Sequence, residues 1–553
     1  MADKLSKPII SMPVTLQRRA VKNLDKKRAK ELEARHSKYY RGDRNIPALI
    51  QCRRSEVNHF RGQVYNPFKK LPMASEHWMS RSTIGDYFAF SPFRAPSATS
   101  WYKYAPTPED SFQFAEGEKQ KISKSAKPSF KEYGFDDRLL SALVRIGIKI
   151  PTNIQFDALP LLLSGKSGLI ASETGNGKTV AFLLPTLQKI LNSYEVSPDL
   201  TNRKYMSPLA VIATPGRELA SQIKDVAEAL CADLDINIKF VTGSSTQSKI
   251  ENTHRDRVDL LVGSTGGLSK MFGGNLFFSD FIDTIVLDEV DTLVDDSFKA
   301  ITSELLAKLR KKLEQQLIFA GATFPSNLNT SLGHIIDTED LEIIQTRHLH
   351  RVLPNVYQKF IKSPKVGRLD YLLDVIEPDV DKKRKVLIFC NKASTAAYIN
   401  HSLNEQGIPT LHFAGGNMNP STRQHNLNMF MNEDDCNVLA CTDLVSRGID
   451  TQMIHHVVNY DFPISMVDYL HRVGRVGRVG QNLSGAKVTN LVCGKISVAL
   501  VQEIEKSVRL NKAIPDVESN VKSLYEKYAQ TTLVKPGKNK TVNMSTDEFS
   551  EID

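Results

Sequence analysis

Ser172-Glu173-Thr174-Gly175-Asn176-Gly177-Lys178-Thr179 is the stretch that decides the fold of this chain. It follows the apolar run 168–171, which predicts a short buried strand, and precedes the apolar run 180–184, which predicts the start of a helix. A glycine-rich loop with Lys-Thr in that setting cradles phosphate through loop N–H groups and the helix N-terminus. Lys178 neutralises phosphate charge, and the Thr179 hydroxyl binds Mg²⁺. The stretch therefore predicts a nucleoside triphosphate site; a loop that only turns the chain is the weaker interpretation.

Short apolar runs recur along the chain in two groups, with helical patterns between them. The first group comprises residues 209–213, 260–263, 285–288 and 317–320, and the second comprises 386–390, 438–441, 456–460 and 486–492. Such alternation is typical of parallel α/β sheets. We therefore expect an α/β fold with two similar parallel-sheet units. The expected boundaries are an extension at 1–129, units at 130–346 and 357–512, a linker at 347–356 and a polar tail at 513–553.

The positive charge is concentrated at the beginning of the chain. Residues 1–129 hold 25 of the 72 Lys and Arg residues but only 12 of the 62 Asp and Glu residues, so they carry the whole basic excess of a chain with net charge +10. Such a segment either follows nucleic-acid phosphates as a basic arm or is a solvated tail. Residues 60–129 are also rich in aromatic residues, Pro and Ser, which favours a strap that packs onto the folded core over one that stacks on bases.

Cysteine usage and hydropathy limit the class of protein. The six cysteines are scattered, without C-x-x-C pairs or neighbouring histidines, which argues against disulfides and zinc and for a reducing compartment. No apolar run approaches the roughly 18 residues of a membrane span. The first twenty residues make a poor signal peptide and an ambiguous transit peptide.

Adjacent acids end one predicted strand of the first unit, at Asp288-Glu289-Val290-Asp291. Acids at a strand end beside a phosphate loop can complete a magnesium–phosphate site. There Asp288 would hold the metal through its water shell, and Glu289 would orient or deprotonate the attacking water. Taken alone, these acids are better explained as a polar loop cap, but a second motif changes that interpretation.

This second motif, Gly147-Ile148-Lys149-Ile150-Pro151-Thr152-Asn153-Ile154-Gln155, lies upstream of the phosphate loop and downstream of Phe130. Together they resemble the adenine-reading Q motif of the DEAD-box RNA helicases. The resemblance implies that Gln155 pairs with the adenine edge and that Phe130 packs on its face. The triphosphate would then be ATP.

The other motifs of that family follow in order, up to about residue 510. Pro215-Gly216-Arg217-Glu218-Leu219-Ala220 is similar to the RNA-backbone motif P-T-R-E-L-A, 288–291 to the D-E-A-D box, and Gly321-Ala322-Thr323 to the coupling motif S-A-T. Thr442-Asp443, Arg447-Gly448-Ile449-Asp450 and 471–478 resemble the two second-unit motifs that face the nucleotide. The resemblance implies two tandem RecA-like domains and an RNA-dependent ATPase that uses ATP and Mg²⁺.

The resemblance also implies roles for individual residues. Lys178, Asp288 and Glu289 would serve catalysis, together with Arg475 and Arg478 as arginine fingers on the γ-phosphate. The nucleotide would be held by Phe130, Gln155, Thr174, Gly175, Asn176, Gly177, Lys178, Thr179 and, at the ribose, Asp450. Coupling to RNA would involve Asp291, Thr323 and His471. Contacts to the RNA backbone, with little sequence preference, are expected at Arg217, Thr265, Gly267, Arg423 and Thr442.

Several positions depart from the family pattern. Gly216 replaces a Thr, and Gly266-Gly267-Leu268 replaces P-G-R, which removes an Arg that would contact phosphate. Val290 replaces the Ala of the D-E-A-D box, and Val476 replaces a Thr. Gly321 replaces the Ser of S-A-T and so removes a hydroxyl that could hydrogen-bond to Asp291, which would be worth about 0.5–1.5 kcal/mol. We therefore expect intact ATP binding and leave efficient strand separation in question.

A narrower resemblance concerns 13–18, 173–175, 321–325 and 474–480. These stretches resemble the animal mitochondrial DEAD-box helicases that associate with the large mitochondrial ribosomal subunit and its 16S-type rRNA. This implies a location in RNA granules of the mitochondrial matrix, with ribosome assembly intermediates as partners. Separately, we expect a monomer without membrane contacts. The alternative locations are the nucleus and the cytoplasm. The alternative functions are an ATP-gated RNA clamp with little unwinding and a DNA helicase.

Overall fold

The computed structural model describes residues 48–60, 63, 65, 69–92, 129–197, 200, 203–243, 257–323, 328, 332–333, 335, 341–346, 349–353, 356–415, 418–433, 436–443, 453–477, 486–515 and 517. Parts of the predicted extension and nearly all of the predicted tail lie outside these residues. No helix within the described ranges is long and apolar enough to cross a membrane. All six cysteines fall within them and are free thiols.

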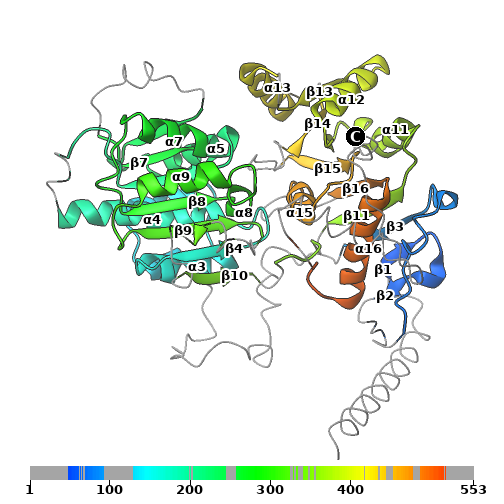
Figure 1. Cartoon of the computed structure of the whole chain (residues 1–553), viewed down its shortest axis with the longest axis horizontal. Helices are drawn as coiled ribbons and strands as arrows, with labels where there is room; N and C mark the ends of the chain where they lie inside the picture. The colour runs from blue at the N-terminus through cyan, green and yellow to red at the C-terminus, as the bar shows by residue number, and fades with distance from the viewer. Residues whose placement is uncertain are drawn as a thin grey trace, which may run out of the picture. The chain divides into compact units, whose positions relative to one another are not determined.

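The first sheet has seven described strands, all parallel, in the order β10-β4-β9-β8-β5-β7-β6 (Figure 1). They are β4 (Gly168–Ala171), β5 (Ala210–Thr214), β6 (Ile238–Val241), β7 (Leu260–Ser264), β8 (Thr284–Asp288), β9 (Gln316–Gly321) and β10 (Glu342–Gln345). Strands β4, β5, β8 and β9 are buried along their whole length. Burial on both faces is what makes them continuous apolar runs in the sequence.

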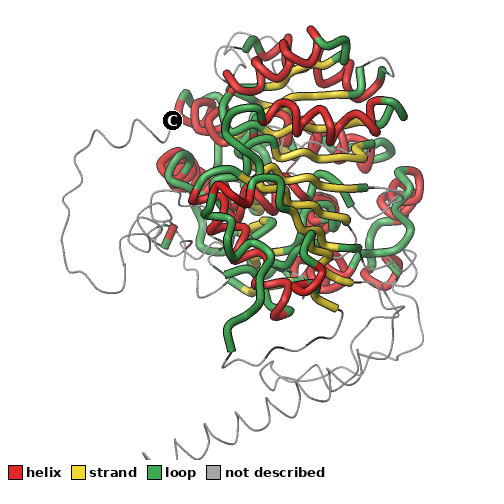
Figure 2. Tube along the Cα trace, turned by 90° about the vertical axis from the view of Figure 1, so that its right-hand side faces the viewer, coloured by secondary structure: helices red, strands yellow, loops and turns green. Residues whose placement is uncertain are grey.

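Helices cover both faces of this sheet, and the side chains of its central strands alternate between two apolar clusters. The elements are η6 (Phe130–Tyr133), α2 (Asp137–Arg145), α3 (Asn153–Leu163), α4 (Lys178–Val196), α5 (Arg217–Leu230), α7 (Thr265–Gly273), α8 (Val290–Leu293) and α9 (Lys299–Leu309). One cluster joins α2, α3, α4 and α5 to the sheet, and the other joins α7, α8 and α9 to it. Figure 2 shows helices flanking the strands on both sides. The predicted first α/β unit is confirmed.

The second sheet begins with six parallel strands, in the order β13-β14-β12-β15-β16-β11. They are β11 (Tyr357–Lys362), β12 (Lys385–Phe389), β13 (Thr410–Phe413), β14 (Val438–Cys441), β15 (Ile454–Asn459) and β16 (Lys487–Val492). The associated helices are α11 (Arg368–Val380), α12 (Ala393–Glu405), α13 (Pro420–Asn432), α15 (Met466–Val473) and α16 (Lys495–Leu510). The predicted second parallel-sheet unit is likewise confirmed.

Three antiparallel strands from the beginning of the chain extend the second sheet beyond β11, in the order β3-β1-β2. They are β1 (Ala48–Cys52), β2 (His59–Phe60) and β3 (Tyr87–Phe90), accompanied by the short helices η1 (Ser55–Val57) and η2 (Arg81–Thr83). We call the described residues within 48–92 the N-terminal module. Figure 1 shows it in blue beside β11 and α16. The sequence did not predict this pairing, although it favoured packing for part of the segment.

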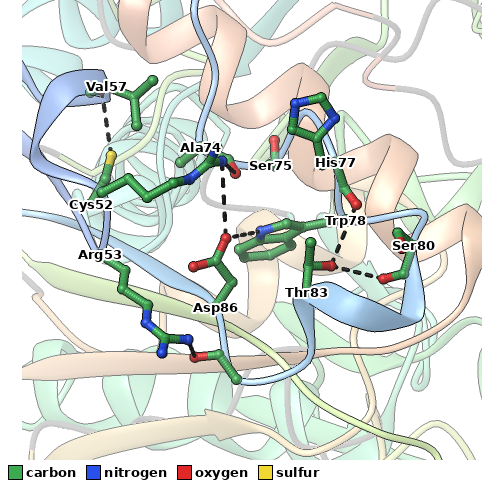
Figure 3. A network of polar contacts seen from close by, with 12 residues as sticks. Cys52, Arg53, Val57, Ala74, Ser75, His77, Trp78, Ser80, Thr83 and Asp86 are labelled. Carbon is green, nitrogen blue, oxygen red and sulfur yellow. Dashed lines mark hydrogen bonds and ion pairs between the residues drawn. The ribbon is translucent and has the colours of Figure 1, made fainter.

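Aromatic side chains bind the N-terminal module to the second sheet. Phe88 lies opposite Phe360 of β11, and their rings stack with centroids 4.8 Å apart. Trp78 is fully buried beside Phe88, and its indole N–H donates to Asp86 at 3.4 Å (Figure 3). Aromatic pairs of this kind add about 0.5–1.5 kcal/mol each beyond the area they bury. The module is therefore part of the core of the second domain.

A buried ion pair on α16 completes the attachment. The Glu505 carboxylate accepts hydrogen bonds from the backbone N–H of Ala74 at 2.7 Å and of Ser75 at 3.0 Å. Its partner Arg509 donates to Glu505 at 2.8 Å and to the Val57 carbonyl at 2.7 Å. Both side chains are fully buried, so each depends on the other for charge compensation. The side chains of α16 thus bind the N-terminal module through hydrogen bonds to the module's backbone.

Replacing Glu505 by Ala should destabilise the second domain strongly, because it leaves the Arg509 guanidinium buried without its counter-ion. We expect the free energy of unfolding to fall by about 3–5 kcal/mol. Glu503→Ala is the matched control on the same helix, because the Glu503–Lys506 pair is exposed and worth at most about 1 kcal/mol. Thermal and urea unfolding of the full chain measure both changes. Equal losses for the two variants would contradict the role assigned to Glu505.

Candidate nucleotide and RNA site

The predicted phosphate loop lies between β4 and α4, at the carboxyl end of its strand. Helix α4 begins at Lys178, directly after Gly177, whose φ of +86° favours glycine. The Lys178 ammonium donates to the carbonyls of Ser172 at 2.6 Å and Glu173 at 3.1 Å. Burial lowers the pKa of Lys178, and the acids around it, first among them Asp288, oppose that change. The loop thus encloses a cation in a polar, largely buried setting.

Gln155, one of the two residues predicted to contact adenine, contacts the phosphate loop. Gln155 is 2% exposed; its side-chain carbonyl accepts from Thr152 N at 2.9 Å, and its amide donates to the Gly177 carbonyl at 3.0 Å. A side-chain carbon at Gly177 would lie only 2.5 Å from the Gln155 amide. The Thr152 hydroxyl donates to the Asn176 carbonyl at 2.8 Å. Gln155 therefore joins the cap of α3 to the loop, while its pairing with adenine stays a prediction.

Phe130, the other residue predicted to contact adenine, lies in η6 and is 4% exposed. Its ring belongs to the apolar cluster formed by α2, α3, α4 and α5 with the first sheet. Its packing on the adenine face likewise stays a prediction.

Glu173 is a residue of the loop to which the sequence assigned no role in the site. Its carboxylate accepts from Asn176 at 3.1 Å and from the Thr346 hydroxyl at 2.8 Å, while its other oxygen is buried without a hydrogen bond. Thr346 directly follows β10 and precedes the predicted linker. The sequence did contain a signal for this contact. A carboxylate in a phosphate-binding loop would repel phosphate, so its side chain is expected to have another partner.

Asp288 and Glu289 lie where the sequence predicts them, at the end of β8 next to β9 and near the phosphate loop. Burial, reinforced by Glu289, raises the pKa of Asp288 to about 7 against the opposing effect of Lys178. Glu289 has the left-handed backbone angle φ of +53° at the start of α8. Such conformations cost of order 1–3 kcal/mol and gather at functional sites. The sheet therefore fixes two buried acids beside the cradle.

The oxygen ligands at this edge of the sheet suit Mg²⁺, which takes few protein ligands, better than a metal ion bound only by protein side chains. In the described ranges no three His, Cys, Asp or Glu side chains gather into a metal-binding group. Mg²⁺ usually takes one or two carboxylates and completes its shell with water and phosphate oxygens. The Thr179 hydroxyl and the Asp288 carboxylate are donors of that kind. A cation would also favour the ionised form of Asp288, whose pKa burial raises.

Asp291 is the centre of the predicted coupling network. One carboxylate oxygen accepts from the backbone N–H of Ala322 at 3.1 Å, from that of Thr323 at 2.9 Å, and from the Thr323 hydroxyl at 2.9 Å. The same oxygen lies 3.3 Å from Nε2 of His471. Although burial would raise the pKa of Asp291, His471 and Thr323 lower it well below its usual value. The structure thus brings together all three residues that were predicted to couple.

The structure describes only some of the second-domain residues that are predicted to contact the nucleotide. Arg475 is 2% exposed, and its Nε donates to the His471 carbonyl at 3.1 Å. The predicted second finger, Arg478, and the predicted ribose contact, Asp450, lie outside the described residues. Sequence reasoning gave no role to Arg472, which is buried and binds both oxygens of Asp443, at 2.5 and 2.7 Å. This pair ties the motif around Thr442 to α15.

The predicted RNA contacts of the first domain gather at the ends of two neighbouring strands. Arg217 begins α5 after β5, and Thr265 begins α7 after β7, which pairs with β5. The Thr265 hydroxyl donates to the Thr214 carbonyl at 2.9 Å. A side chain at Gly267 would lie 2.6 Å from the Thr242 backbone, so glycine is required for packing there. Arg217 thus remains the side chain of this group that could bind phosphate.

The predicted RNA contacts of the second domain lie on α13 and after β14. Arg423 is on α13, and its guanidinium is 3.9 Å from Glu218 of the first domain. Thr442 follows β14, and its N–H donates to the Phe413 carbonyl at 3.2 Å. Their contacts with RNA stay predictions.

Comparison with known proteins identifies the class. The DEAD/DEAH box helicase family model matches residues 152–331, and the model of the helicase conserved C-terminal domain matches residues 365–480. The solved structure of S. cerevisiae Dbp5, described as bound to RNA and ADP BeF3, has the same fold, with a TM-score of 0.58, 24% identity, and coverage of 74% of this chain and all of that one. The chain belongs to the DEAD-box family of ATP-dependent RNA helicases. It is an RNA-stimulated ATPase that uses ATP and Mg²⁺.

Two relatives match most of the chain. The Mus musculus protein named probable ATP-dependent RNA helicase DDX28 is 32% identical over 498 residues, which cover 86% of each chain. The Homo sapiens protein of the same name is 30% identical over 541 residues, which cover 93% of each chain. These matches extend well beyond the two family models. The similarity therefore includes sequence outside the RecA-like domains.

Proposed function

We propose that this protein couples ATP hydrolysis to the local remodelling of RNA duplexes. The observation that carries the proposal is the network around Asp291, in which one carboxylate joins the D-E-V-D stretch to the G-A-T stretch and to His471. A change at the nucleotide can move both stretches because their hydrogen bonds share that carboxylate. Coupling between two sites requires such a shared element that both can bias.

We further propose that the RNA is the large-subunit rRNA of mitochondria, bound during ribosome assembly in the mitochondrial matrix. The narrower resemblance in the sequence supports this, and so does the extent of the match to the mouse and human relatives. The basic excess of residues 1–129 supports RNA as the partner, since counterion release favours such a segment on phosphate backbones. Crosslinking the protein to RNA in cells and sequencing the recovered RNA tests the assignment. Recovery of nuclear or cytosolic RNA alone would refute it.

The rival function, an ATP-gated clamp, predicts different kinetics. A helicase should release a short RNA duplex and turn over ATP repeatedly, whereas a clamp should hold RNA with negligible turnover. Measuring duplex release with ATP and with a non-hydrolysable analogue separates the two functions. Equal stimulation of ATP turnover by DNA and RNA would instead favour a DNA helicase.

Glu289→Gln should trap the protein on RNA when ATP is present. The substitution keeps the size of a side chain predicted to orient or deprotonate the attacking water, so ATP binding should survive while turnover falls by about 10²–10⁴-fold. Glu304→Gln is the matched control, because Glu304 is exposed on α9 and forms a surface ion pair with its neighbour Lys308. RNA dissociation rates with and without ATP measure the effect. Tight RNA binding that does not depend on ATP would contradict the proposed coupling.

A further inference from the structure

Gly321 lies at a junction between the phosphate loop and Asp291. It ends β9, where its register partner is Ala171 of β4, and its carbonyl accepts from the N–H of Ser172 at 3.2 Å. The next two residues supply the N–H groups of Ala322 and Thr323 that donate to Asp291. A displacement of the backbone at residue 321 would therefore change the hydrogen bonds of both the loop and the coupling carboxylate.

The space beside Gly321 is already filled. A side-chain carbon added there would lie 3.0 Å from the Thr323 carbonyl oxygen and 3.3 Å from the Cγ1 methyl of Val290, both tighter than ordinary van der Waals contact. It would lie 3.6 Å from the Asp291 carboxylate carbon, an ordinary contact. The methyl of Val290 thus borders the position that a larger residue at 321 would occupy.

Val290 cannot readily give way. It is fully buried in the cluster formed with α7 and α9, and it stands between Glu289 and Asp291 at the first position of α8. A β-branched side chain in a helix is held to one strongly preferred rotamer. Close-packed interiors respond to even one extra methylene. Any adjustment to a side chain at 321 would therefore fall on the backbone of 289–291 or of 321–323.

The hydrogen bonds of Asp291 do not require a hydroxyl at residue 321. One of its oxygens accepts the two N–H groups and the Thr323 hydroxyl, and the other accepts the N–H of Thr292 at 3.0 Å. This carboxylate is satisfied by the backbone turn itself. The hydrogen bond lost with the Ser of the S-A-T pattern is thus replaced by donors of the turn 321–323. The Gly at residue 321 therefore does not by itself argue against strand separation.

We propose that Val290 and Gly321 are a size-matched pair that positions the turn 321–323 between the phosphate loop and Asp291. The larger residue in the D-E-A-D box takes the place of a side chain in the S-A-T motif, so the two departures compensate each other. Both residues are positioning residues, because they act through Asp291 and Ser172 and not on ATP or RNA. The inference rests on the coupling role proposed above for Asp291.

The pair predicts that restoring the family's Ser at residue 321 lowers the efficiency of duplex release, although this change returns the motif to the family pattern. Gly321→Ser should lower the number of duplexes released per ATP about tenfold, and Gly321→Ala should do the same because the added carbon is the cause. Adding Val290→Ala to Gly321→Ser removes the contact with the Val290 methyl but not the one with the Thr323 carbonyl, so it should bring the ratio part of the way back to that of wild type. Val290→Ala alone should lower it less than Gly321→Ser does.

The measurements are RNA-stimulated ATP turnover, its KM for ATP, duplex release, and the thermal unfolding midpoint, all on the full chain. A merely structural effect would lower the midpoint without changing duplexes released per ATP. The proposal would be overturned if Gly321→Ser released as many duplexes per ATP as wild type. It would also be overturned if adding Val290→Ala to Gly321→Ser did not raise that ratio. If the wild-type chain released no duplex, the proposed function would fail. The pairing of Val290 with Gly321 would then be tested by whether Val290→Ala restores the ATP turnover that Gly321→Ser lowers.

Discussion

Lys178→Ala should abolish nucleotide binding and ATP turnover. The ammonium interacts favourably with the carboxylates of Asp288, Asp291, Glu173 and Glu289, and it donates to the two carbonyls at the start of the phosphate loop. Its removal strengthens the repulsion between these acids and the phosphates of ATP. Losing one member of a buried charge pair costs on the order of 2–5 kcal/mol, so ATP affinity should fall by roughly 30-fold to a few thousand-fold.

Titration with a fluorescent ATP analogue measures this loss directly. Lys166→Ala is the matched control, since Lys166 lies just before β4 and pairs with Glu342 on the surface. Exposed pairs contribute at most about 1 kcal/mol, so the control should bind ATP like the wild type. The unfolding midpoint of both variants shows whether the fold is retained. A folded Lys178→Ala chain with unchanged ATP affinity would refute the assignment of the phosphate loop.

Deleting residues 1–92 should prevent the second domain from folding stably. The deletion removes β1, β2 and β3 and uncovers the ring of Phe360 together with the Glu505–Arg509 pair. It also removes the buried side chains of Ile50, Trp78, Phe88 and Phe90. Each such side chain is worth about 1.5–3 kcal/mol. Their sum is of the same order as the 5–15 kcal/mol that stabilises a whole domain.

A deletion of residues 1–47 is the matched control, because it keeps the N-terminal module. Both chains are compared by solubility, circular dichroism and ATP turnover. The shorter deletion should leave fold and basal turnover intact, and the dependence of its RNA affinity on salt tests the basic-arm interpretation for those residues. Equal stability of the two deleted chains would show that the module is dispensable for the second domain.

Much of the nucleotide site was predictable because its residues come from strand ends. The runs that precede Ser172 and Glu289 are short, apolar and buried on both faces, and parallel strands bring their carboxyl ends to one edge. Local sequence therefore located the loop and the acids. By contrast, the contact between Glu173 and Thr346 joins residues far apart in the chain, and no local pattern encodes it.

The sequence by itself determined the two parallel sheets, the phosphate cradle and the family, because each depends on residue types at short, fixed spacings. Only the tertiary structure decided that the N-terminal module belongs to the second sheet. Its strand β3 pairs with β11, although the whole first domain separates the two strands in the sequence. Neither strand's sequence indicates which strand it will pair with. Only the structure, likewise, decided that Val290 fills the space beside Gly321. That space exists only once β8 and β9 lie side by side.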